Sequence, residues 1–297
     1  MVGKNKYLQQ LEALGHWFFY VTLHLFGQRG AHILLVPVVL SYVLWSRKIR
    51  RTVQPYLKRR FPKASVIGYF RHTFLTVFSF GRVLVERGWL GTVKDACLSG
   101  TIEGYEQITA EIAKGKGLVL LTAHMGNWQS ALANLGDLPV PVNALMLYDK
   151  KAVAKHYFDL NRSKKSFQII DAEGGFGGMV DSLAALNRGE VVTIMGDRFI
   201  KGSSTTVDFL GSEIKLPDSA YMLAASAGAP VAIVFAAQTG GGSYQLKVWD
   251  IFYPEYKSRD ERGQMLMGCA EKFSSAMEEY LVLYPYQWYN FHNFWKK

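Results

Sequence analysis

The chain has 297 residues, of which 49% are hydrophobic and 14% aromatic, so its composition excludes a disordered polypeptide and predicts one large domain or two small ones. The formal net charge is +10, but the first 60 residues carry ten Lys or Arg and one acid, whereas the other 237 carry 24 basic and 23 acidic residues. Positive charge confined to one end, beside apolar segments, argues against a nucleic-acid groove and predicts an anionic membrane surface as a partner.

The N-terminal segment, residues 1–60, combines apolar stretches with basic clusters. The apolar stretches are 16–26 and 31–45, separated by Arg29, and Lys and Arg are frequent within 47–60. Neither stretch reaches the roughly 20 apolar residues that span a bilayer. We therefore expect helices that lie in or dip into the cytoplasmic leaflet, with core helices or a single span as alternatives. The late start of the first stretch and the lack of a small-residue cleavage site argue against a signal peptide.

The body of the chain, residues 61–297, predicts an α/β domain. After a helical stretch that follows residue 60, short apolar runs alternate with helical patterns, which is typical of a central, mostly parallel mixed sheet flanked by helices. The last strands, on either side of Gly240 and Gly242, are candidates for antiparallel pairing, and residues 260–284 predict a helix stopped by Pro285. The predicted strands are 117–122, 142–148, 167–171, 191–195, 205–209, 230–236 and 244–250, and the predicted helices between them are 127–136, 151–160, 176–188 and 218–227.

Several common catalytic motifs are missing from this sequence. The glycines at 115–117 precede a strand and no GKS or GKT follows, so they do not form a phosphate-binding loop, and those at 174–178 lack dinucleotide-binding spacing. There is no GxSxG elbow and no HExxH, and the two cysteines, Cys97 and Cys269, match no metal or redox spacing. We expect neither a metal site nor a bound cofactor.

His124 is the leading candidate for chemistry. It follows the apolar run GLVLL, at the predicted carboxyl end of a strand, where ligands bind in parallel α/β sheets. A histidine there can take a proton from a hydroxyl or amine at neutral pH. Gly126 permits a close approach of backbone or substrate, and Asn127 can cap the next helix. A structural histidine at a helix entrance is the alternative.

Four blocks of the sequence, in order, resemble a known enzyme family. TAHMGNWQ (122–129) resembles the HX4(D/E) block of the glycerolipid acyltransferase superfamily, and more closely the HxGNWE form of its lipid A lauroyl/myristoyl acyltransferase branch. Three further blocks, 184–198, 207–236 and 284–295, are similar to that branch in order and spacing. The resemblance covers roughly residues 10–297 and does not specify the substrate.

The resemblance implies acyl transfer at the cytoplasmic face of the bacterial inner membrane. An acyl thioester, carried by acyl carrier protein or coenzyme A as co-substrate, would donate its fatty chain to a hydroxyl or amine of a lipid or glycolipid acceptor, with His124 as general base. A thioesterase and a non-catalytic lipid- or carrier-binding relative are the alternatives. Backbone N–H groups near Gly126 and Asn127 are candidate oxyanion donors. The residues assigned to substrate binding are Gly126, Asn127, Trp128, Glu173 and Arg198.

The chain departs from this family at Gln129, where the family has an acid. An amide can orient the imidazole but cannot stabilise the imidazolium by charge. Another acid can supply that charge, with Asp197 the first candidate and Glu173 the second. Alternatively, the enzyme works with Gln129 alone, or the protein is catalytically weak. Arg198, next to Asp197 after another predicted strand, can bind a phosphate through two hydrogen bonds or can pair with Asp197 to hold a loop.

Overall fold

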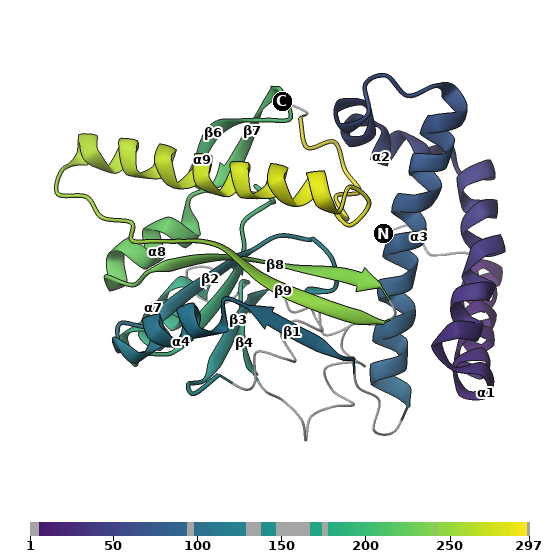
Figure 1. Cartoon of the computed structure of the whole chain (residues 1–297), viewed down its shortest axis with the longest axis horizontal. Coiled ribbons are helices and arrows are strands. Elements are labelled where there is room, and N and C mark those ends of the chain that lie inside the picture. Colours follow the sequence, from purple (N-terminus) through teal and green to yellow (C-terminus); the bar gives the residue numbers. More distant parts are fainter. Residues whose placement is uncertain are drawn as a thin grey trace.

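The computed structural model describes residues 6–93, 98–128, 138–146, 167–173, 178–240 and 242–295. Long helices form the N-terminal part of the chain, and strands and helices alternate through most of the rest (Figure 1). The helices are α1 (Lys6–Trp45), α2 (Arg47–Arg60), α3 (Val66–Thr92), α4 (Tyr105–Ala113), α7 (Met179–Asn187), α8 (Ser219–Ala227) and α9 (Arg259–Leu283). The strands are β1 (Gly100–Glu103), β2 (Leu118–Thr122), β3 (Val142–Met146), β4 (Phe167–Asp171), β5 (Val191–Met195), β6 (Ser204–Phe209), β7 (Ser212–Pro217), β8 (Val231–Gly240) and β9 (Ser243–Phe252).

The central sheet has seven strands in the order β1-β9-β8-β2-β5-β3-β4. All neighbouring pairs are parallel except β8 and β9, which form an antiparallel hairpin. The predicted α/β class and mostly parallel mixed sheet are therefore confirmed, as is the antiparallel pairing of the last strands. The strand predicted at 205–209 lies in a separate hairpin of β6 and β7, and β1 and β7 were not predicted.

Both faces of the sheet are buried, which explains the unbroken apolar runs of its central strands. Side chains alternate along β2, so Val119 and Leu121 join a core cluster on one face, while Leu118 and Leu120 join a second cluster on the other. Helices α7, α8 and α9 supply the first cluster and α4 supplies the second. Figure 1 shows α9 lying across one side of the sheet.

The three N-terminal helices connect to the body of the chain in two ways. Helices α1 and α3 lie side by side, and Leu35 and Val39 pack in one cluster with Val85 of α3 (Figure 1). Helix α2 packs against the main core instead, and its Tyr56 hydroxyl donates to the carbonyl of Pro285, 2.7 Å away. The predicted boundary between two domains at residue 60 stays a prediction. Helix α3 follows that boundary in the sequence and packs against α1, which precedes it.

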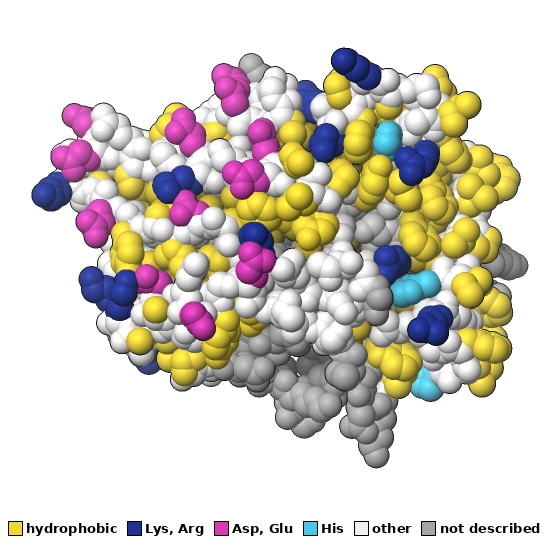
Figure 2. Space-filling view, in the orientation of Figure 1, with side chains coloured by type: hydrophobic (Ala, Val, Ile, Leu, Met, Phe, Trp, Pro, Cys, Tyr) yellow, Lys and Arg dark blue, Asp and Glu magenta, His cyan; other side chains and the backbone are white. Residues whose placement is uncertain are grey.

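Helix α1 joins the two predicted apolar stretches across a break at Gly27, which has a φ of 63°. The segment Trp17–Trp45 is the one described helix long and apolar enough to cross a membrane, and only 22% of its most apolar window is buried. In the view of Figure 2, apolar and basic side chains cover this end of the molecule and acidic side chains lie over the α/β part. The exposed large apolar side chains here include Trp17, Leu25, Phe26, Ile33 and Trp45 of α1 and Val66 and Ile67 of α3.

Candidate active site

The candidate active site lies where two neighbouring parallel strands end. Strands β2 and β5 pair in register, with Thr122 opposite Met195 at their carboxyl ends. His124 and Asp197 each come two residues after these positions, so the parallel pairing brings together two side chains that are 73 residues apart in sequence. This is the sheet edge at which ligands bind in α/β proteins.

His124 and Asp197 form a close pair. Nδ1 of His124 lies 2.8 Å from Oδ1 of Asp197, and the His124 backbone N–H donates to Oδ2 over 3.2 Å. An ionised carboxylate only accepts hydrogen bonds, so the Nδ1 nitrogen carries the proton and Nε2 holds the lone pair. The His124 side chain is 23% exposed, whereas that of Asp197 is fully buried. The ring is thus oriented from the protein interior and is still reachable from outside.

The environment of Asp197 keeps its carboxyl ionised. Burial opposes ionisation, but the charge and hydrogen bond of His124, the charge of Arg198 and a hydrogen bond from Trp288 outweigh it and hold the pKa at about 2. The Trp288 indole Nε1 donates to Oδ2 over 3.1 Å, and Trp288 is itself buried. A permanent anion beside an imidazole stabilises the imidazolium that forms when Nε2 accepts a proton.

A C-terminal segment, residues 287–289, holds the loop that carries His124. The Tyr289 N–H donates to the carbonyl of His124, and the Gly126 N–H donates to the carbonyl of Gln287, both over 2.8 Å. Gly126 is required here because its φ is 54° and a Cβ atom would lie 2.0 Å from the carbonyl oxygen of Ala236. The close approach expected at Gly126 is therefore an approach of the β8 backbone.

These contacts modify the expectations for two residues of the His124 block. The Gly126 N–H is already donated to Gln287, so it is not available as an oxyanion donor in this structure. Asn127 is fully buried, and its Nδ2 lies 3.4 Å from Oε2 of Glu86, which removes its side chain from substrate contact. Trp128 is partly buried, and its ring centroid lies 6.5 Å from that of His124.

The structure also describes two other predicted site residues, Arg198 and Glu173, and their contacts differ. The Arg198 Nη2 donates to the carbonyl of Tyr289 over 3.1 Å, while its buried Nε has no hydrogen-bond partner in the described part of the chain. Glu173 is exposed after the edge strand β4, where its N–H donates to Asp171, and no described contact joins it to His124. Gln129 lies outside the described residues. Within the described ranges, no three His, Cys, Asp or Glu side chains gather in a metal-binding group.

Sequence reasoning missed the site contributions of Trp288, Gln287 and Glu86. The first two lie in the block 284–295, which resembles the family in order and spacing, but that resemblance did not indicate any contact with the His124 loop. The adjacent Gln287 and Trp288 gave no indication in the sequence that the indole N–H reaches a carboxylate. Glu86 had no local signal, because an acid within an amphipathic helix is usually exposed.

Comparisons with known proteins find one matching family model and two similar proteins. The family model described as bacterial lipid A biosynthesis acyltransferase matches residues 51–297. The chain is also 26% identical, over 160 residues, to a phosphatidylinositol mannoside acyltransferase of Mycobacterium tuberculosis (strain ATCC 25618 / H37Rv), covering 51% of this chain and 49% of that protein. A protein of the same description from strain CDC 1551 / Oshkosh is 26% identical over 137 residues, covering 44% and 42%.

The chain spans about half the length of the curated relatives it matches, whereas the family model extends over most of the chain, from α2 to the C-terminal segment that holds the His124 loop. Both findings come from acyltransferases, as the four sequence blocks implied. The chain belongs to the bacterial lipid A biosynthesis acyltransferase family.

Proposed function

We propose that this acyltransferase moves a fatty acyl chain from the thioester of acyl carrier protein or coenzyme A to a hydroxyl or amine of a lipid or glycolipid acceptor. The observation that carries the proposal is the pairing of a partly exposed His124 with the buried, ionised Asp197 over 2.8 Å. This pairing is the arrangement that general-base catalysis needs. Both relatives are described as phosphatidylinositol mannoside acyltransferases, which favours a glycolipid among the possible acceptors.

His124 performs the proton transfers in this mechanism. Its Nε2 takes the proton of the acceptor hydroxyl or amine as the acceptor oxygen or nitrogen attacks the thioester carbonyl carbon. The tetrahedral oxyanion then collapses, the carbon–sulfur bond breaks, and the imidazolium returns the proton to the departing thiolate. Asp197 holds the ring in one tautomer and stabilises its positive charge throughout.

No covalent enzyme intermediate is needed in this scheme. Cys269, the cysteine in the described ranges, is buried, and burial raises the pKa of its thiol to about 11 although Lys272 opposes the effect. A protonated thiol is a poor nucleophile at neutral pH. Direct transfer between donor and acceptor therefore suits the residues of the site.

Arg198 is the proposed contact for a substrate phosphate. Its Nη2 is engaged by the Tyr289 carbonyl, which fixes the guanidinium beside the pair, and its Nε lacks a partner among the described residues. Because the Nε is buried, a substrate phosphate would bind the other guanidinium N–H groups of this partly exposed residue. That phosphate would belong to the pantetheine arm of the donor or to the acceptor lipid.

The N-terminal helices are proposed to hold the enzyme on the cytoplasmic face of the bacterial inner membrane. Exposed apolar side chains of α1 adjoin the exposed cations Arg47, Lys48, Arg51 and Lys58 of α2. Apolar insertion combined with cationic flanks favours an anionic bilayer surface. Sedimentation with vesicles tests this, since binding to anionic vesicles should exceed binding to neutral ones and weaken as salt rises; equal binding to both would contradict it.

Lipid mass spectrometry tests the proposed reaction. Membrane lipids are compared between bacterial cells that express the chain and cells that express His124→Ala, with Tyr253→Phe, a change far from the pair, as the matched control. We expect a new acylated lipid with the unchanged chain and with Tyr253→Phe but not with His124→Ala. Purified protein is then given an acyl thioester with and without acceptor lipid. Release of free fatty acid at equal rates in both cases would indicate a thioesterase instead.

A further inference from the structure

A buried carboxylate that the mechanism does not use lies behind the active-site loop. Glu86 of α3 is fully buried, and its two carboxylate oxygens accept hydrogen bonds from two side-chain amides. Asn127 Nδ2 donates to Oε2 over 3.4 Å, and Gln238 Nε2 donates to Oε1. Burying an acid is costly unless its partners serve a purpose, so this cluster requires an explanation.

The partners of Glu86 lie in the segments that build the active site. Asn127 follows His124 by three residues, in the loop after β2. The Gln238 backbone at the end of β8 exchanges two hydrogen bonds with the Gln287 side chain, of 2.8 and 2.9 Å. The Gln287 carbonyl accepts from the Gly126 N–H. One carboxylate thus joins helix α3 to the His124 loop, to β8 and to the C-terminal segment.

We propose that Glu86 is a positioning residue, whose carboxylate holds Asn127 and Gln238 and thereby fixes the segment from His124 to Asn127 in the geometry that acyl transfer needs. The expected effect of Glu86 on the reaction rate rests on the proposed function. Its expected effect on the conformation of the loop does not. Glu86 acts through Asn127, and no described hydrogen bond joins it to His124.

The role depends on two acceptor oxygens. Asn127 and Gln238 both present NH₂ groups, so a carboxylate accepts a hydrogen bond from each. A glutamine or a protonated acid at position 86 offers one acceptor and one donor, so on one side two donors would face each other. Burial raises the pKa of Glu86 to about 7, against the opposing effects of Arg82 and of the two amide hydrogen bonds.

Other titratable groups face the same cluster. They are the guanidinium of Arg82, one turn earlier on α3, the Tyr289 hydroxyl of the C-terminal segment, and the Tyr244 hydroxyl of β9, which accepts from Gln238 Nε2 over 3.1 Å. Burial raises the pKa of Tyr289 well above its ordinary value, so this hydroxyl stays neutral across the working range. Near pH 7, Glu86 is therefore the member of this set that titrates.

The experiment relocates the carboxylate within the full chain. Glu86→Gln should lower kcat about 10- to 100-fold with little change in KM for the acyl donor, because a shifted loop misplaces the base without removing a binding group. Gln238→Glu alone should be as harmful, since two carboxylates then meet. The double variant restores every pairing. Asn127 donates to the amide oxygen introduced at position 86, the new NH₂ at 86 donates to the carboxylate introduced at 238, and the Tyr244 hydroxyl donates to that carboxylate. We expect kcat to recover to within about 3-fold of the unchanged chain.

Three further readouts decide whether the effect is positioning. Amide hydrogen exchange in residues 118–128 should speed up in Glu86→Gln, recover in the double variant and leave the peptides of α9 unchanged. The ratio of kcat in the unchanged chain to kcat in Glu86→Gln should fall as pH drops below about 7, because Glu86 then gains a proton and loses one of its two acceptor oxygens, whereas loss of the His124 base affects both proteins alike. The stability of the unchanged chain relative to Glu86→Gln should decline as pH rises from about 4.5 to 7, because the unfolded acid is then ionised while the folded one still binds its proton.

Each contrary result has a definite meaning. An unchanged kcat in Glu86→Gln would overturn the proposal, as would a folded double variant that stays as slow as the single ones. Faster exchange throughout the protein in Glu86→Gln would also overturn it, since Glu86 would then act on global stability alone. If the unchanged chain transfers no acyl group but exchange in 118–128 follows the expected order, the positioning role stands and the proposed function fails.

Discussion

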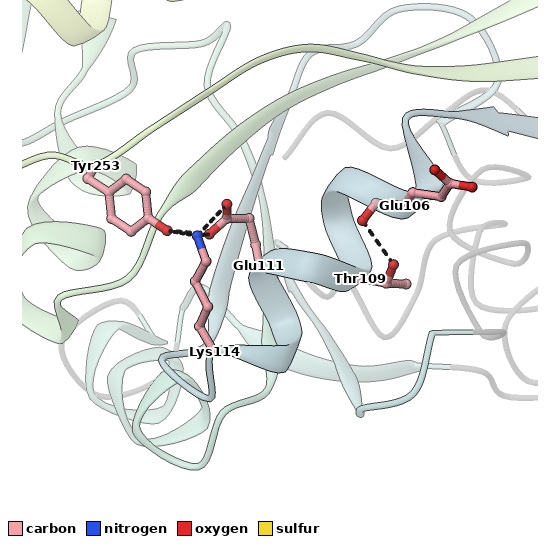
Figure 3. A network of polar contacts seen from close by, with 5 residues as sticks. All are labelled: Glu106, Thr109, Glu111, Lys114 and Tyr253. Carbon is pink, nitrogen blue, oxygen red and sulfur yellow. Dashed lines mark hydrogen bonds and ion pairs between the residues drawn. The ribbon is translucent and has the colours of Figure 1, made fainter.

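Two polar clusters of this protein use the same kinds of groups in opposite surroundings. In the first, the carboxylate of Asp197 meets an imidazole and an indole while fully buried. In the second, Glu111 on α4 meets Lys114 and Tyr253 near the surface (Figure 3). Lys114 Nζ lies 2.8 Å from both Glu111 oxygens and 2.9 Å from the Tyr253 hydroxyl, and its side chain is 51% exposed.

The contrast shows that hydrogen-bond geometry does not identify a functional site by itself. Water and salt screen the Glu111 cluster, and each of its members can be solvated when the others leave. The Asp197 carboxylate is fully buried, so water screens its charge little, and this charge acts strongly on the partly exposed ring of His124. Burial of the anion with partial exposure of the ring turns an ordinary pair of polar contacts into a candidate catalytic base.

The largest expected effect is that of Asp197→Asn. An amide whose NH₂ faces Nδ1 favours the wrong imidazole tautomer and provides no charge, so kcat should fall at least about 100-fold. Turnover of an acyl thioester with acceptor lipid measures this, with His124→Ala as the reference for a lost base. Near-normal turnover would show that the His124–Asp197 pair has only a structural role, as the exposed Glu111 cluster does.

The same variant makes a prediction about acid stability. Because the Asp197 pKa is about 2 in the folded protein, below its ordinary value of 3.8, this group contributes stability above about pH 4 that is lost as pH falls toward 2. The difference in Tm between the unchanged chain and Asp197→Asn should therefore shrink as pH is lowered from 7 to 3. A difference that stays constant would contradict the ionised state assigned to Asp197.

Trp288→Phe should have an intermediate effect. It removes the indole hydrogen bond to Asp197 Oδ2 and leaves a ring in the same core position. Loss of a hydrogen bond to a charged group predicts a destabilisation of about 1.5–3 kcal/mol. Denaturant unfolding measures it. Phe294→Leu, a change among the aromatic neighbours that removes no hydrogen bond, serves as the packing control, and an equal loss of stability in both variants would make the indole N–H unimportant.

Gln129→Glu should change kcat by no more than about 3-fold, because the imidazolium already has one buried carboxylate beside it. The measurement is steady-state turnover at pH 7.5. A large gain would mean that Asp197 does not replace the acid that the family has at this position, while a large loss would mean that the site is built around the amide.

The smallest effect is expected at the exposed cluster. Tyr253→Phe removes the hydroxyl that bridges Lys114 and Glu111, and a partly exposed position such as this should shift Tm by less than about 2 °C and leave kcat unchanged. A marked loss of activity would show that α4 and the end of β9 influence the site, and the contrast between the two clusters would then need another explanation.

Much of the fold could be predicted from local patterns. The apolar run before His124 and the similar run at 191–195 are strands as expected, because strands covered on both faces are apolar throughout. Strands β1 and β7 were missed because GTIE and SEIKLP are short and half polar, and their pairing partners β9 and β6 decide their conformation.

The site residues, too, fall into those that local sequence predicts and those that it does not. His124 was identified from its own block, and Asp197 was a candidate because it follows a strand. Asp197 rather than Glu173 lies beside His124 because of the strand order, which places β5 next to β2 and places β4 at the edge of the sheet. Glu86, Trp288 and the engaged Gly126 N–H belong to long-range contacts for which no sequence pattern exists.

By itself, the sequence determined the α/β class, the apolar and basic N-terminal segment, and the histidine block, since these follow from the periodicity and chemistry of neighbouring residues. Tertiary structure alone decided which carboxylate serves His124 and how the loop around it is held. The reason is physical: the pKa of Asp197 and the orientation of the imidazole depend on burial and on partners 73 and 91 residues away, which meet only when the parallel strands pair and the C-terminal segment closes over their ends.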